Sequence, residues 1–167
     1  MYIPFDELKA ESRVWIYQGK RAMSASEKST IDQLLHSFCY QWAAHGQPLK
    51  TSFKIELNQF VIMAVDEDFR NPSGCSIDSS VGVLRQIQSA TGIDFLDRSL
   101  VPFYINNQVD LIPLAEIKSG FVSGRLRPDT ITFNTLAVTK GELESRWKIP
   151  TEKSWMAKYL PKTTLTQ

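Results

Sequence analysis

The chain has 167 residues, of which 43% are hydrophobic and 22% charged, and this composition excludes an intrinsically disordered protein. The length predicts a single domain spanning residues 1–167. The net charge is +1, but residues 120–167 carry eight Lys and Arg against four acids, whereas residues 1–119 carry eleven against fourteen. This basic C-terminal third either favours an anionic partner or forms an ordinary solvated face.

The first predicted strand covers residues 13–19, where β-branched and aromatic residues alternate up to a glycine. A helix follows, because Ser24 and Glu27 have capping-box spacing and apolar residues then recur at helical spacing. We expect this helix to end at His45-Gly46, where the glycine supplies a left-handed cap. Cys39 lies on or beside the apolar stripe of the helix, so we expect it to pack in the core.

Three further strands and a second helix are predicted next in the chain. Residues 52–57 and 60–65 predict a hairpin, and the second run is apolar on both faces, as in a strand that is covered on both sides. Residues 81–92 have helical apolar spacing and end at a glycine. Residues 100–105 predict another strand, in which Pro102 favours an edge position.

This order of elements is the pattern of the ferredoxin-like split βαβ sandwich, an α+β fold in which two helices cover one face of an antiparallel sheet. We therefore predict a ferredoxin-like core over residues 13–106. Residues 107–167 are expected to form a mostly helical extension, with a short strand near 130–133 and a helix begun by Thr139 and Glu142 at capping-box spacing.

The predicted sheet has no polar face, because apolar residues occupy both sides of its strands. The face opposite the two helices must therefore be covered, either by the C-terminal extension or by the second subunit of a homodimer.

Several kinds of chemistry lack their sequence motif in this chain. A phosphate-binding loop requires Gly-x4-Gly-Lys-Ser/Thr, which is missing. Residues 59–65 do not resemble the aromatic and basic pattern with which a sheet reads RNA, so nucleic acid is not an expected partner. The histidines and cysteines have no paired ligand spacing, which disfavours a metal, and the sequence indicates no cofactor.

The compartment can also be predicted from the sequence. Cys39 and Cys75 do not form the pattern of a disulfide framework. Residues 1–10 lack a signal-peptide pattern, and no apolar run approaches the roughly 18 residues that cross a bilayer. The sequence therefore predicts a cytoplasmic protein without membrane insertion.

The stretch from Asn71 to Ser80, with the sequence Asn-Pro-Ser-Gly-Cys-Ser-Ile-Asp-Ser-Ser, is the best candidate for a functional site. The two helices of the predicted fold are antiparallel, so we expect His45 at the end of the first to lie near Cys75 at the start of the second. A helix dipole and a nearby histidine both lower the pKa of a thiol. This predicts a thiol site of Cys75 and His45, with the imidazole oriented by Asp66, Asp68 or Asp78.

Two other interpretations of the same stretch remain open. The start of the helix can bind an anion or another small ligand through its backbone N–H groups. The small residues of this ligand site are Gly74, Ser76, Ser79 and Ser80. Alternatively, Ser76 or Asp78 is an ordinary N-cap and Cys75 is a small residue packed beneath the loop.

The predicted function is the binding of a small molecule or a protein, and the alternative is a small thiol-dependent or hydrolytic enzyme that uses Cys75 and His45.

The whole chain resembles a family of short Bacteroidetes proteins. The residues that carry the resemblance are Met1-Tyr2-Ile3-Pro4-Phe5, Arg13-Val14-Trp15-Ile16-Tyr17-Gln18, Trp42-Ala43-Ala44-His45-Gly46, the stretch from Ser73 to Ser80, and Glu152-Lys153-Ser154-Trp155. Members of the family often carry the label "ABC transporter ATPase", and the missing phosphate-binding loop disfavours that activity here. The family has no established activity, so the resemblance implies no functional residues.

Overall fold

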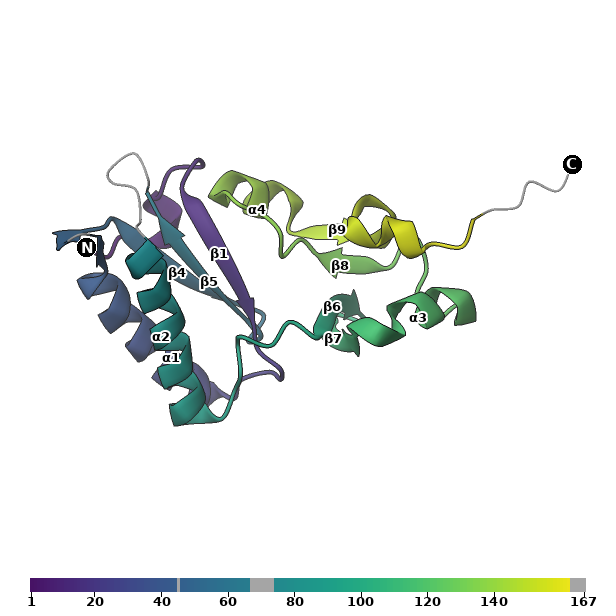
Figure 1. The fold of residues 1–167 in the computed structure, drawn as a ribbon, viewed down its shortest axis with the longest axis horizontal. Coiled ribbons are helices and arrows are strands. Elements are labelled where there is room, and N and C mark those ends of the chain that lie inside the picture. Colours follow the sequence, from purple (N-terminus) through teal and green to yellow (C-terminus); the bar gives the residue numbers. More distant parts are fainter. Residues whose placement is uncertain (45, 67–73, 163–167) are drawn as a thin grey trace, which may run out of the picture. The chain divides into compact units, whose positions relative to one another are not determined.

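The protein folds into two compact units in a computed structural model that describes residues 1–44, 46–66 and 74–162 (Figure 1). Unit 1 contains Met1–Asp97 and Thr135–Ser145, and unit 2 contains Arg98–Asn134 and Arg146–Gln167. All strand pairs of the three sheets are antiparallel, and helices accompany the sheets in both units, so the α+β class is confirmed. The boundary between the units differs from the predicted boundary at residue 106.

The main sheet of unit 1 has the strand order β1-β5-β4. Its strands are β1 (Arg13–Gln18), β4 (Thr51–Glu56) and β5 (Phe60–Val65). β4 and β5 form the predicted hairpin, and Leu57 and Asn58 at its turn both have positive φ, as the two central residues of a type I′ turn require. Every residue of β5 is buried, which confirms that both faces of this strand are covered.

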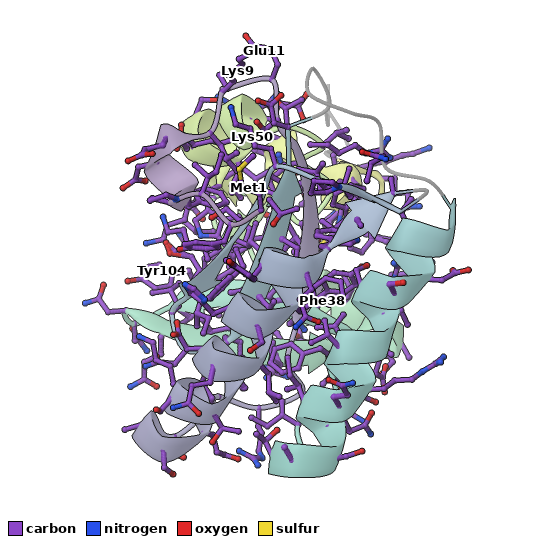
Figure 2. All side chains as sticks on the ribbon, turned by 90° about the vertical axis from the view of Figure 1, so that its left-hand side faces the viewer. Met1, Lys9, Glu11, Phe38, Lys50 and Tyr104 are labelled. Atoms are coloured by element: carbon purple, nitrogen blue, oxygen red, sulfur yellow. The ribbon has the colours of Figure 1, made fainter. Side chains whose placement is uncertain are left out.

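Two long helices, α1 (Ala25–Gln41) and α2 (Gly74–Thr91), lie side by side across one face of this sheet (Figures 1 and 2). The predicted capping box begins α1, because the Ser24 hydroxyl accepts from the Glu27 N–H and the Glu27 carboxylate accepts from the Ser24 N–H. α1 ends at Gln41, earlier than expected, and the chain continues into the short strand β2 (Ala43–Ala44), which pairs with β3 (Gln47–Pro48).

The core of unit 1 lies between the two helices and the sheet. The strand register aligns Trp15, Met63 and Phe53 across the sheet, and these residues share the helix-facing side with their neighbours two positions along. The buried residues of this core are Met23, Ile31, Leu35, Cys39, Trp42, Ala44, Leu49, Phe53, Val61, Met63, Val65, Val83, Leu84, Ile87, Ile93 and Phe95.

The C-terminal third returns to unit 1 beside the start of β1. Val14 donates its N–H to the Val138 carbonyl, and α4 (Lys140–Arg146) begins there with the predicted Thr139–Glu142 capping interaction. The buried Lys140 side chain donates to the carbonyls that end η1 (Phe5–Glu7), a 3-10 helix that packs against β4. Part of the C-terminal third thus packs on the N-terminal part of unit 1.

Unit 2 has a four-stranded sheet of order β7-β6-β8-β9. Its strands are β6 (Leu100–Ile105), β7 (Gln108–Pro113), β8 (Ile131–Phe133) and β9 (Lys148–Pro150). Short helices accompany the sheet, and they are η2 (Leu114–Glu116), α3 (Ile117–Ser123), η3 (Thr151–Lys153) and η4 (Trp155–Tyr159). Residues 107–167 therefore supply three strands as well as helices, whereas the sequence predicted a mostly helical extension.

The strand expected to complete a four-stranded ferredoxin-like sheet is β6, and it pairs with β7 and β8 instead of β1. The described sheet of unit 1 accordingly has three strands. The edge position predicted from Pro102 is wrong, because β6 has a neighbour on each side. Proline is tolerated there because β8 pairs only with Phe103 and Tyr104, and the Pro102 carbonyl accepts from the Thr132 hydroxyl.

Candidate functional site

The predicted thiol site falls largely outside the described part of the chain. Cys75 lies in the first turn of α2, which begins at Gly74. The side chains of Cys75 and Ser76 are outside the described side chains, the exposure of Gly74 is likewise not described, and His45 is outside the described residues. The separation of Cys75 and His45 therefore remains a prediction. Since α2 begins at Gly74, the prediction that Ser76 or Asp78 is its N-cap is wrong.

Three other residues of the predicted site lie in the first turns of α2. Asp78 and Ser79 are exposed. Ser80 is buried, and its hydroxyl donates a hydrogen bond of 2.6 Å to the Ile77 carbonyl within the helix. The Ser80 proton is therefore already used in a bond to the helix backbone.

The helix arrangement on which the thiol hypothesis depends is present. Arg21, ahead of α1, donates to the Thr91 carbonyl at the end of α2 over 3.0 Å, so the start of one helix lies near the end of the other. β2, which follows α1, packs against α2. The two helices are antiparallel, as predicted.

Cys39 is buried in the core of unit 1, as predicted. Burial raises the pKa of its thiol to about 12, because the apolar surroundings disfavour a thiolate. Cys39 is therefore a packing residue and not a nucleophile at neutral pH.

Charge is divided unequally between the two units. Unit 2 contains nine Lys and Arg against four acids, a net charge of +5, whereas unit 1 contains ten against fourteen, a net charge of −4. The difference in net charge between the units is larger than that between residues 120–167 and residues 1–119. One reason is that Thr135–Ser145, with one lysine and two glutamates, belongs to unit 1.

Within the described part of unit 2, almost all cations lack an ion pair with a carboxylate. Arg127 pairs with Asp129 at 2.9 Å, and among the described residues no carboxylate lies within ion-pair distance of the other eight. These eight are Arg98, Lys118, Arg125, Arg146, Lys148, Lys153, Lys158 and Lys162. Among the described residues, most of the positive charge of unit 2 therefore lies outside ion pairs.

Several of these cations lie on the outer surface of the helices that cover the unit 2 sheet, and this surface is called the basic layer below. Its exposed cations and large apolar side chains are Leu114, Lys118, Val122, Arg125, Lys153, Trp155 and Lys158, and the same short helices also expose Glu116 and Glu152. α3 buries Ile117 and Phe121, so Lys118 and Val122, one turn apart, both face solvent. The basic layer therefore combines four cations and two acids with exposed apolar side chains.

The basic layer is attached to a packed core. Phe121 of α3 and Met156 of η4 pack in one cluster with Phe103 of β6, and η4 lies against α3. α3 ends at Gly124, whose φ of +81° suits glycine, and the Leu126 side chain then covers Gly120. A Cβ on Gly120 would come within 2.9 Å of Leu126, so glycine is needed for this close approach.

The lysine of η4 lies over two aromatic rings. The Lys158 ammonium is 5.9 Å from the Trp155 ring centroid and 5.1 Å from that of Tyr159. The two rings meet edge to face, with an interplanar angle of 85°. On the other face of the same sheet, the Lys148 ammonium lies 3.9 Å from the Tyr104 ring centroid. Cation–π contacts therefore occur on both faces.

Other kinds of site are not found among the described residues. No three His, Cys, Asp or Glu side chains of the described chain are grouped as a metal would require. No described helix is long and apolar enough to cross a membrane. Comparison with family models, curated proteins and solved structures gives no match. The basic layer was missed as a site from the sequence, although the basic excess of residues 120–167 was a signal for it.

Proposed function

We propose that this protein is a cytoplasmic binding protein whose basic layer engages an extended anionic partner. The observation that carries the proposal is the net charge of +5 on the 59 residues of unit 2, with eight cations that have no carboxylate partner among the described residues. Unpaired surface charge of one sign attracts a partner of opposite sign and accelerates its association.

The overall charge makes this asymmetry informative. The whole chain carries only +1, so general basicity would give little affinity for a polyanion. A strong, localised affinity therefore has to come from unit 2. The proposed binding function does not require nucleotide hydrolysis, so it does not depend on the ATPase label of the family that the chain resembles.

Chromatography on immobilised heparin, a polyanion, tests the proposal. We expect the wild-type protein to be retained and the double variant Lys118→Gln, Lys158→Gln to elute at clearly lower salt, because two unpaired charges have been removed. The matched control is Lys28→Gln, which removes an exposed lysine of α1 in unit 1. Equal elution of the double variant and the wild type, or an equal shift in the control, would contradict the proposal.

A thiol-dependent enzyme is the second candidate, supported by the antiparallel helices and the position of Cys75 in the first turn of α2. Its test is the rate of alkylation by iodoacetamide at pH 6.5, about two units below the pKa of an ordinary thiol. The hypothesis predicts that Cys75 reacts faster than a model thiol and that His45→Ala removes the difference. If Cys75 reacts no faster than the model thiol, an activated nucleophile is excluded.

A further inference from the structure

We propose that the partner of the basic layer is an anionic lipid surface, on which unit 2 docks without crossing the bilayer. This inference rests on the proposed function and names its partner. The exposed apolar side chains that accompany the cations carry it. Val122 is 75% exposed, Leu114 47% and Trp155 37%.

Each apolar side chain of the basic layer has a cation beside it. Lys118 is four residues from both Leu114 and Val122, and Lys158 lies over the Trp155 ring. Peripheral membrane proteins use this combination, because apolar side chains enter the boundary between headgroups and acyl chains while Lys and Arg contact anionic headgroups. Tryptophan favours the same interfacial depth.

A single-stranded nucleic acid fits the surface less well. Its bases stack on the faces of exposed aromatic rings, and aliphatic groups do not contribute to that stacking. The most exposed apolar side chain of the basic layer is the aliphatic Val122. The exposed aromatic of the layer is Trp155, and the ring beside it, Tyr159, is perpendicular to it. The surface therefore favours lipid over bases.

The attachment of the layer suits docking as a preformed surface. Ile117 and Phe121 anchor α3 in the core, and the fully buried Met156 anchors η4. The residues that would enter the lipid are therefore presented by elements fixed on their inner side. The side chains of the basic layer therefore lose little conformational entropy on binding, which raises the affinity that a small site can reach.

Flotation of the full-length protein with lipid vesicles tests the inference. We expect binding to phosphatidylcholine vesicles that contain about one quarter phosphatidylserine, and no binding to phosphatidylcholine alone. Lys118→Gln with Lys158→Gln should weaken vesicle binding about twenty-fivefold, at about fivefold per charge. Val122→Ser should weaken it about five- to tenfold by removing inserted apolar groups.

Two controls match these variants in unit 1. Lys28→Gln removes one positive charge, and Tyr40→Ser removes a side chain that is 70% exposed on α1. Both should bind vesicles as the wild type does. Brominated acyl chains should quench tryptophan fluorescence in the wild type, and Trp155→Phe should lose most of that quenching.

The outcomes separate this inference from the proposed function. Retention on heparin without vesicle binding, or a preference for a single-stranded oligonucleotide over vesicles, overturns the lipid assignment and leaves the proposed function standing. Vesicle binding that Val122→Ser does not weaken and that shows no bromolipid quenching also overturns it. Failure to bind either heparin or vesicles overturns both proposals.

Discussion

Replacing Lys140 by methionine should destabilise the protein by about 3 kcal/mol, because a buried ammonium that satisfies two carbonyls is lost. Lys140 is only 5% exposed, and its Nζ donates to the Leu8 carbonyl at 2.8 Å and to the Asp6 carbonyl at 3.1 Å. Each hydrogen bond from a charged group contributes roughly 1.5–3 kcal/mol, and removal of the buried lysine's desolvation cost offsets part of that sum. Methionine keeps the volume of the side-chain stem.

Urea unfolding at neutral pH measures this change. A loss of about 3 kcal/mol corresponds to a fall in Tm of about 10 °C for a protein of this size. Lys28→Met, on the exposed surface of α1, is the control and should stay within about 0.5 kcal/mol of the wild type. Faster amide exchange at Val14, whose N–H donates to Val138, should accompany the loss. A Lys140→Met variant as stable as the control would show that the two hydrogen bonds of Lys140 do not stabilise the fold.

Four further outcomes are expected. Gly120→Ala brings a Cβ within 2.9 Å of a packed side chain and should cost about 1–3 kcal/mol in urea unfolding, whereas Gly82→Ala, with open space around the new Cβ, should stabilise α2 by about 0.5–1 kcal/mol. Because burial raises the pKa of Cys39 from 9.0 to about 12, the unfolded state releases this proton first as pH rises. The contribution of Cys39 to stability should thus fall by about 1.4 kcal/mol per pH unit between those values, and Cys39→Ala should remove that contribution. The hydrogen bond from Arg21 lowers the pKa of Glu27 to about 2. The stabilising contribution of the Glu27 carboxylate is therefore complete above pH 4.5 and is lost as pH falls towards 2. NMR titration of the Glu27 carboxyl should show a higher pKa in Arg21→Gln than in the wild type. Size-exclusion chromatography with light scattering tests the alternative that a second subunit covers the sheet, and a monomer mass would exclude that homodimer.

Local patterns were the part of the fold that the sequence predicted well. The capping residues Ser24 and Glu27 are three positions apart, so their interaction requires only that α1 begins there. The same holds for Thr139 and Glu142 at α4. The all-apolar run of β5 also predicted burial on both faces, because neither side of such a strand tolerates water.

The pairing of β6 was not predicted, although its partner β7 is adjacent in the chain. The decisive element is β7, which follows β6 after the turn residues Asn106 and Asn107, both with positive φ. Asparagine tolerates that conformation, so this pair was a hairpin signal that the sequence reading missed. A hairpin partner adjacent in the chain gives β6 a neighbour at low entropic cost, whereas pairing with β1 requires closing a much longer loop.

The candidate site was only partly visible in the sequence for a related reason. The excess of Lys and Arg over acids in residues 120–167 can be counted from the sequence. Residues 135–145, however, belong to unit 1, and only the fold shows that they must be left out of the charge of unit 2. The alternation of Lys118 and Val122 on one side of α3 likewise depends on which side the helix buries. That choice is made by Ile117 and Phe121 packing against the sheet.

NMR chemical-shift mapping with lipid nanodiscs that contain phosphatidylserine would locate the docking of unit 2 on anionic lipid residue by residue. Amide shifts and line broadening should concentrate at α3 and η4, around Lys118, Val122 and Lys158, and should weaken as salt is added. Perturbations centred instead on the start of α2, at residues 74–80, with α3 and η4 unchanged, would contradict this docking.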